Sequence, residues 1–223
     1  DVFSRHAHTD CVLFDVMQWF DDHHQQRIPL PQFEVMSGYE AFSESLSWAI
    51  HGVYMARRAL YDRYPYDDSC RAYSDDNTTR LHYYISREVR PCGGLYYYRQ
   101  HEASVTHKAG LRHFDYLRAN ESMRRQLIDL GVGDDVLRRY ENQRWLVLVD
   151  CWRFYFIHRQ RMTPHDRRAA RAEMKRVWKT IDTTTLEPRN KWKLGYMPLR
   201  PSWRLFCLQE KLYFTLKRWL RRL

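Results

Sequence analysis

The sequence has few cysteines and no pattern that would pair them. The five are odd in number and lie far apart, with neither a CxxC pair nor a histidine spacing typical of a zinc site: Cys11, Cys70, Cys92, Cys151 and Cys207. They are typical of reduced thiols, so the sequence predicts a cytoplasmic protein without a disulfide framework.

Long apolar runs are also missing. The longest, residues 145–157, is interrupted by Asp150 and Arg153 and is shorter than the ~20 residues that a spanning helix needs. No internal repeat or low-complexity tract stands out. The sequence therefore predicts neither a secretion signal nor a transmembrane helix.

What the sequence does have is positive charge and aromatic side chains. It carries 37 Lys and Arg against 27 Asp and Glu, a formal charge of +10, and 15% of its 223 residues are aromatic. The aromatic content predicts a folded core, and the charge favours an anionic partner such as a phosphorylated molecule, an acidic membrane or nucleic acid. Basic residues crowd residues 118–222, whereas residues 1–76 are rich in acids.

Two β-prone runs in the first half predict strands of a mixed sheet and an α/β fold class. Asp10–Val16 is a short apolar run that suits a buried strand. Leu95–Tyr98 is an aromatic run that reads as a second strand, preceded by a turn at Gly93 and Gly94.

Helices are predicted between these strands. Ser37 is a candidate N-cap with Glu40 at the third helical position, and residues 46–61 carry apolar residues at helical intervals. Asp75 and Asp76 come just before, or at, the N-terminus of another helix.

Beyond Lys108 the pattern is helical. Asn120 is a candidate cap, Gly131 a candidate terminator, and Thr163 with Asp166 opens a further helix across a proline that suits the first helical position. We place the domain change near residues 108–118.

Three blocks of the first half resemble a known family: Asp10–Asp15, Tyr73–Thr79 and the segment YYYRQxxxSxTH over Tyr96–His107. Their order and spacing resemble the C-terminal part of bacterial family 2 glycosyltransferases of the GT-A fold, which act in capsule, lipopolysaccharide and exopolysaccharide synthesis. The resemblance implies that 1–112 is the acceptor-side half of such a domain, with an incomplete Rossmann-like mixed sheet. Residues 113–223 would then be a basic, mostly helical extension.

The resemblance also implies ligands. The donor would be a nucleotide sugar, the acceptor a glycan or lipid-linked glycan, and the metal Mg²⁺ or Mn²⁺, hard ions that prefer carboxylate and phosphate oxygens. The family's nucleotide-binding half, with its DxD metal motif, is expected before Asp1, and no DxD stands in a fitting context here. We therefore expect a truncated product, a fragment or one part of a split enzyme.

Asp76 is the predicted catalytic base. Inverting sugar transfer needs a carboxylate that takes the proton of the acceptor hydroxyl, and Asp75-Asp76 occupies the place of the family's acidic pair. The resemblance implies that Asp76 is the base and Asp75 its polar support. The alternative is that either residue merely caps the helix that follows.

The predicted substrate contacts fall in two segments. By resemblance, the first closes over the donor diphosphate, and its His101 or His107 would help to bind the metal; its residues are Arg99, His101, Ser104, His107 and Lys108. The second segment is Trp48–Arg58. The resemblance implies that it forms the acceptor wall together with Ser37–Phe42, with Trp48, His51 and Arg57 as sugar contacts. The alternatives are a solvated loop for the first segment and core packing for Trp48.

Residues 203–223 predict a basic amphipathic helix. Leucines recur at helical spacing among Arg and Lys, which suits an anionic membrane surface and a peripheral location on the inner face of the plasma membrane. Docking of this helix on its own domain or on a partner is equally open. A non-catalytic subunit that supplies acceptor and membrane binding is an alternative function. Nucleic acid is the weaker partner, because no helix-turn-helix, zinc-finger or RNP pattern is visible.

Overall fold

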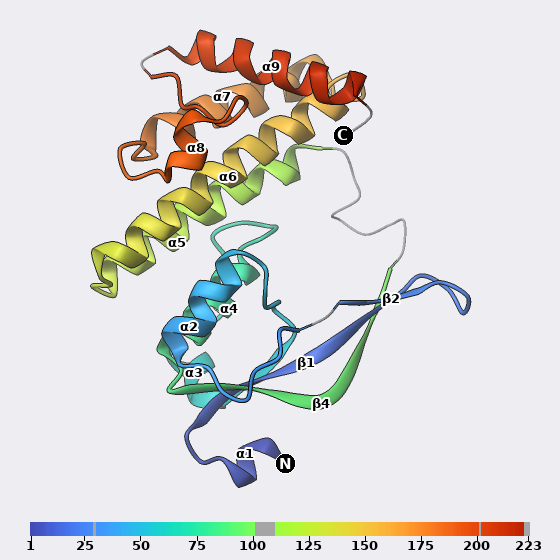
Figure 1. The fold of residues 1–223 in the computed structure, drawn as a ribbon, viewed down its shortest axis with the longest axis vertical. Coiled ribbons are helices and arrows are strands. Elements are labelled where there is room, and N and C mark those ends of the chain that lie inside the picture. Colours follow the sequence, from blue (N-terminus) through green and yellow to red (C-terminus); the bar gives the residue numbers. More distant parts are fainter. Residues whose placement is uncertain (29, 101–109, 201, 221–223) are drawn as a thin grey trace. The chain divides into compact units, whose positions relative to one another are not determined.

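A computed structural model describes residues 1–28, 30–100, 110–200 and 202–220. The chain divides into two compact units. The sheet unit comprises Asp1–Ser69 and Tyr73–Lys108, and the helical unit comprises Cys70–Ala72 and Ala109–Leu223. Figure 1 shows strands in the first and helices throughout the second. The predicted mixed α/β class is therefore confirmed, with 54% helix and 15% strand among the described residues.

The sheet is built around one long strand, β1 (Thr9–Trp19). It pairs in parallel with β4 (Glu88–Arg99) along its whole length. Its C-terminal half pairs antiparallel with β2 (Gln25–Ile28) and its N-terminal half antiparallel with β3 (Tyr54–Ala56). The two predicted strands and the mixed pairing are thus confirmed. Because β4 occupies one edge of β1, β2 and β3 share the other.

The predicted turn at Gly93-Gly94 is wrong. Both glycines lie inside β4, where the pairing steps from Leu13 opposite Pro91 to Asp15 opposite Leu95. Extra residues of β4 are thus accommodated against β1, which is a bulge and not a reversal of the chain. A Cβ added at Gly94 would lie 3.0 Å from the Phe14 ring, so the missing side chain allows this close approach.

Two helices, α2 (Gly38–Leu46) and α4 (Asp75–Ile85), pack together in the sheet unit. The predicted cap of α2 is confirmed as a capping box: the Glu40 amide donates to Ser37 Oγ at 3.3 Å, and the Ser37 amide donates to the Glu40 carboxylate at 2.8 Å. A Cβ at Gly38 would come within 2.3 Å of the Ser86 carbonyl oxygen, so α2 begins against the end of α4. A four-residue helix, α1 (Val2–Arg5), precedes β1.

The single helix predicted over residues 46–61 is wrong. Helix α2 ends at Leu46, β3 and α3 (Arg58–Arg63) follow, and Trp48 takes a left-handed φ of 61° that a continuous helix does not permit. Ile50 and Leu60 are both buried, but from two different segments, and this common burial mimicked a helical period.

The helical unit contains one 3₁₀ turn and five α-helices among its described residues. They are η2 (Leu111–Phe114), α5 (Asp115–Asp129), α6 (Asp134–His158), α7 (Pro164–Thr180), α8 (Pro188–Trp192) and α9 (Trp203–Trp219). Their shared core holds Trp145, Leu148, Trp152, Trp178 and Phe206. The predicted helical pattern beyond Lys108 is thus confirmed for residues 110–200 and 202–220.

Two helix ends of this unit were predicted correctly and one was not. Gly131 has a φ of +67° after α5, and the Thr163 side chain accepts a hydrogen bond from the Asp166 amide at 3.1 Å. Asn120 is not a cap: it is buried inside α5, where its side-chain amide donates to the Tyr116 carbonyl. The helix begins earlier, at Asp115, because Leu117 joins the core.

The end of α7 is completed from far along the chain. The Arg200 guanidinium donates to the carbonyl oxygens of Trp178 and Ile181, the latter at 2.7 Å, and lies 4.5 Å from the centre of the Trp178 ring. Carbonyls that the helix itself cannot satisfy are thereby paired with a cationic donor. No helix in the described part of the chain is long and apolar enough to cross a membrane.

Candidate functional site

The two predicted catalytic carboxylates occupy the first turn of α4. Asp75 is exposed and Asp76 is half-buried. The loop before the helix is tied to this turn: the Asp67 amide donates to Thr78 Oγ1 at 2.8 Å, and the Asn77 side chain donates to the Asp67 carboxylate at 2.7 Å. These bonds fix the position from which Asp76 projects.

Burial raises the pKa of Asp76 to about 6, with a smaller contribution from the neighbouring Asp75 carboxylate. Arg80 opposes this shift through its positive charge. A carboxylate with a pKa near 6 is mostly ionised at neutral pH, yet is more basic than an ordinary aspartate. This combination suits a general base.

Arg80 lies one helical turn beyond Asp76, at the i+4 position, and is almost completely buried, with 2% of its surface exposed. Its guanidinium carbon lies 5.3 Å from the centre of the Trp48 ring. Neither terminal guanidinium nitrogen has a hydrogen-bond partner among the described residues. Buried guanidinium groups are normally paired. The sequence offered no sign of this arginine, since nothing in it distinguishes a buried Arg from an exposed one.

Trp48 is held beside Arg80 in a strained backbone. Its φ is 61°, and Tyr73, just before α4, has a φ of 69°. A non-glycine residue in this left-handed region costs about 1–3 kcal/mol, and such residues cluster at functional sites. Half of the Trp48 surface is exposed, so this side chain is accessible to a ligand. The core-packing alternative for Trp48 therefore does not describe the whole side chain.

His51 belongs to the same loop as Trp48 and packs against α4. Tyr83 of α4 donates from its hydroxyl to the His51 carbonyl at 2.6 Å, and His51 Nδ1 accepts from the Val53 amide at 3.1 Å. Burial lowers the pKa of His51, so the ring is neutral at physiological pH and its proton resides on Nε2. The structure thus brings four of the predicted site residues to one helix: Asp75 and Asp76 on α4, and Trp48 and His51 beside it.

Arg57 and Arg99 lie elsewhere in the sheet unit. Arg57 donates to the carbonyls of Thr9 at 2.7 Å and Ala7 at 3.2 Å, so its guanidinium holds the segment before β1. Arg99 ends β4 and lies over the Trp19 ring at 5.3 Å. The remaining predicted contacts, His101, Ser104, His107 and Lys108, lie outside the described residues.

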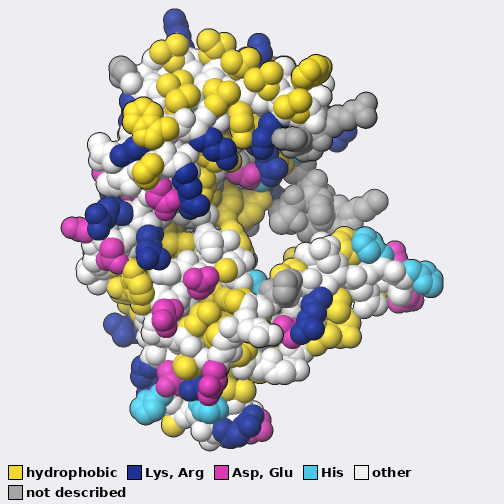
Figure 2. All heavy atoms as spheres, viewed as in Figure 1, with side chains coloured by type: hydrophobic (Ala, Val, Ile, Leu, Met, Phe, Trp, Pro, Cys, Tyr) yellow, Lys and Arg dark blue, Asp and Glu magenta, His cyan; other side chains and the backbone are white. Residues whose placement is uncertain are grey.

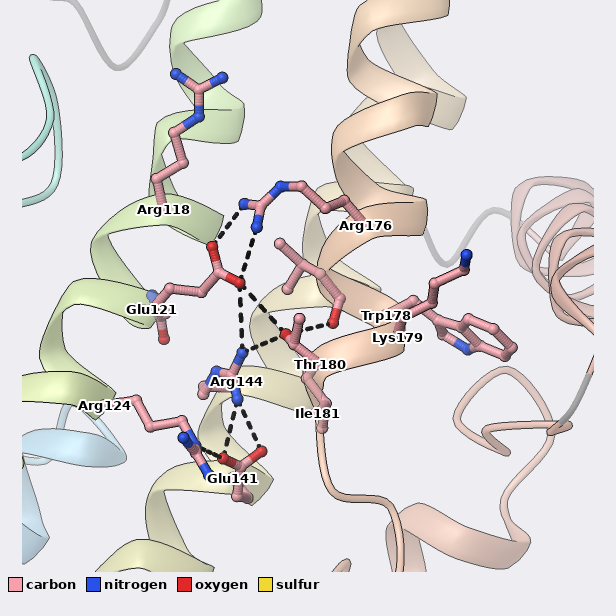
Figure 3. Close-up of polar contacts among 12 residues, drawn as sticks. Arg118, Glu121, Arg124, Glu141, Arg144, Arg176, Trp178, Lys179, Thr180 and Ile181 are labelled. Atoms are coloured by element: carbon pink, nitrogen blue, oxygen red, sulfur yellow. Dashed lines mark hydrogen bonds and ion pairs between the residues drawn. The ribbon is translucent and has the colours of Figure 1, made fainter. Parts of the chain in front are cut away.

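The helical unit has a polar cluster of its own, in which α5, α6 and α7 meet (Figure 3). Arg144, 1% exposed, donates to both Glu141 oxygens, at 2.9 and 3.0 Å, and to Thr180 Oγ1 at 2.7 Å. Arg124 also pairs with Glu141, and Arg176 donates to both oxygens of Glu121, at 3.0 and 2.5 Å.

The carboxylates of this cluster are already paired, so it lacks a free base or ligand. Each glutamate lies between arginines from two helices, as the dashed contacts of Figure 3 show. Such an arrangement fixes the packing of three helices, and breaking it is costly because it leaves a buried charge behind. We therefore assign the cluster a structural role and place the candidate site at Asp76.

The described residues contain no group of three or more His, Cys, Asp or Glu side chains that could hold a metal ion. Asp75 and Asp76 thus do not form a metal centre with a third described ligand. No family model, curated protein or solved structure matches the chain. The function of the site is therefore inferred from its own geometry and from the sequence resemblance.

Proposed function

We propose that the chain is the acceptor side of an inverting glycosyltransferase, with Asp76 as the general base. The observation that carries this proposal is the environment of Asp76: a half-buried carboxylate with a pKa of about 6, in the first turn of α4, next to a buried arginine that contacts an exposed tryptophan. Class and fold family come from the sequence resemblance, and the environment of Asp76 supports the role of this residue.

The proposed reaction requires a proton acceptor and a group that orients the acceptor sugar. The Asp76 carboxylate accepts the proton of the acceptor hydroxyl while the oxygen attacks the anomeric carbon, and the diphosphate leaves from the opposite face. The exposed face of Trp48 stacks on the apolar face of a sugar ring and so orients the hydroxyl toward the base. Positioning of this kind supplies much of the rate enhancement in transfer reactions.

Arg80 and the strained backbone support the same assignment. A guanidinium at the i+4 position favours the ionised form of Asp76, so the base is ready at neutral pH even though burial opposes its charge. Strain at Trp48 and Tyr73 is expected where a fold holds side chains for a ligand and not only for packing.

Donor and metal binding belong to the family pattern and not to the described residues. A nucleotide sugar with Mg²⁺ or Mn²⁺ is the donor that the resemblance implies, with main metal ligands in a preceding half. Among the residues that the structure describes, no cluster of His, Cys, Asp or Glu offers a metal site. Arg99, which is exposed at the end of β4, is the described candidate for a diphosphate contact.

The test is sugar transfer by the protein that contains this chain together with a donor-binding half. Labelled UDP- and GDP-sugars are supplied with glycolipid extracts as acceptors. Asp76→Asn should reduce turnover by about 10²- to 10⁴-fold, the usual effect of removing a general base, while donor affinity stays unchanged. Asp75→Asn, one residue away on the exposed side, is the matched control and should retain most activity.

Wild-type kcat/KM should fall as pH drops below about 6, where Asp76 becomes protonated. Equal activity of Asp76→Asn and wild type would refute the proposal.

A non-catalytic binding subunit is the second candidate, and one observation favours it: helix α9 exposes an apolar face. If this is the function, Asp76→Asn leaves biological activity unchanged, whereas changes on α9 abolish it.

A further inference from the structure

Helix α9 has two faces of different character. The inner face carries Phe206 and Phe214, which are 0% and 2% exposed and belong to the core of the helical unit. The outer face and the C-cap residue that follows it carry six large apolar side chains that are 42–79% exposed: Leu205, Leu208, Leu212, Leu216, Trp219 and Leu220. We call these six residues the apolar stripe. Docking of the helix on its own domain, one of the two open interpretations, thus accounts for only one face.

The stripe is continuous along the helix. Its members recur at intervals of three and four residues from Leu205 to Trp219, which places them on one side of an α-helix. Figure 2 shows hydrophobic side chains gathered over α9, with Lys and Arg side chains at their margins. A contiguous exposed apolar surface of this kind is unusual for a protein that stays entirely in water.

Basic side chains accompany the stripe. Arg204, Lys211 and Arg218 are exposed and seven residues apart, so they form a row beside the leucines. No ion pair within the described residues involves any of the three. Their charge is therefore available to an anionic partner.

The only acid of α9 does not oppose this charge. Glu210 is fully buried on the inner face, and burial raises its pKa to about 9, so it is protonated at neutral pH. The 17-residue helix consequently presents leucines, one terminal tryptophan and only positive charge to the outside.

We propose that the outer face of α9 binds the surface of an anionic lipid bilayer, with the apolar stripe inserted at the boundary between headgroups and acyl chains. The basic row then lies at the level of the acidic headgroups, and Trp219 takes the interfacial position that this side chain favours. Charge complementarity selects the bilayer over a protein groove, because the stripe is flanked by cations and by no exposed acid of its own helix. The inference does not rest on the sugar-transfer proposal.

Vesicle co-sedimentation of the whole chain tests the proposal. Wild type is compared on phosphatidylcholine vesicles and on vesicles that also contain phosphatidylglycerol. Leu208→Glu with Leu212→Glu interrupts the stripe at two exposed positions, so the fold should survive. Deletion of the helix is unsuitable, because Phe206 and Phe214 would leave the core. The matched control is Ile128→Glu, a similarly exposed apolar residue on α5.

A second pair of variants isolates the charge. Arg204→Glu with Lys211→Glu reverses the basic row, and Arg168→Glu with Lys175→Glu makes the same change in net charge on the exposed surface of α7. At the usual gain per basic residue near an anionic surface, reversing two residues should weaken binding by about ten-fold or more. The α7 control should bind like wild type.

The outcomes separate the proposal from its competitors. Wild type should bind anionic vesicles at least about ten-fold more tightly than neutral ones, and the stripe variant should lose this binding. Wild-type binding by the stripe variant overturns the proposal. The proposal is also overturned if the wild-type protein does not bind vesicles but forms oligomers that the stripe variant cannot form. A second copy of the chain would then cover the stripe. Asp76→Asn should bind vesicles normally, so failure here and failure of the catalytic proposal are distinguishable.

Discussion

Replacing Asp76 by asparagine should stabilise the sheet unit above about pH 7, although it removes the base of the proposed sugar transfer. Burial raises the pKa of this carboxyl from 3.8 to about 6, so the folded protein holds the proton more tightly than the unfolded chain. Below the unfolded-state pKa, Asp76 is protonated in both the folded and the unfolded chain and has no effect on stability. Between the two values stability falls as the pH rises, and above about 6 the full penalty of a buried charge remains.

The magnitude follows from the shift. About two pKa units correspond to about 3 kcal/mol at 1.36 kcal/mol per unit. Because Asp76 is only half-buried, solvent screening reduces this to about 1–2 kcal/mol. Asparagine also loses the favourable interaction of a carboxylate with the helix N-terminus, about 0.3–1 kcal/mol. The net gain above about pH 7 is therefore about 1 kcal/mol, and it should vanish near pH 4.

Urea-dependent hydrogen exchange, read on peptides from β1 and α4, is the appropriate assay, because circular dichroism is dominated by the helical unit. Asp75→Asn is the control: it is exposed, and its loss of about 0.3–1 kcal/mol should be a simple destabilisation. If Asp76→Asn destabilises the sheet unit above about pH 7 by the roughly 0.5–2 kcal/mol typical of a lost cap, Asp76 is a helix cap and the reasoning from burial fails.

Two further predictions concern the helical unit. Arg144→Leu should destabilise it by about 3–5 kcal/mol in urea unfolding followed by circular dichroism, because Glu141 keeps only the partly exposed Arg124 as an ion-pair partner and Thr180 loses a donor. Arg153→Ala, which breaks an exposed pair with Asp150, should cost at most about 1 kcal/mol, and equal losses would contradict the structural role of the cluster. Glu210→Gln should flatten the pH dependence of the free energy of unfolding. In the wild type this free energy should decline from about pH 4.5 to about pH 9, because the folded state resists ionisation of Glu210. If the variant shows the same slope as wild type, this carboxyl is not buried in solution.

The sequence predicted those features that depend on neighbouring residues. The Ser37 capping box, the Thr163 cap and the Gly131 terminator each require only a few consecutive side chains, and all three are present. The strands β1 and β4 were predicted from runs of β-prone residues, although β4 begins well before the aromatic run, at Glu88.

Features that depend on distant contacts were missed. Ile50 and Leu60 were assigned to one helix because both are apolar, yet they reach the core from separate segments. Arg80 and Arg144 look like any other arginines in the sequence, since their burial results from packing by elements far along the chain. For the candidate site, the sequence predicted Asp76, Trp48 and His51, but it could not show that Arg80 connects the first two.

The reach of Arg200 to the end of α7 bears on how the helical unit is made. The carbonyl of Trp178 receives its donor from 22 residues further on, so a nascent chain that stops before Arg200 carries α7 without this cap. Helix α7 is thus completed only once the segment containing α8 has left the ribosome and folded back. Synthesis itself therefore sets an order, in which α5 and α6 can pair early and the last turn of α7 closes late.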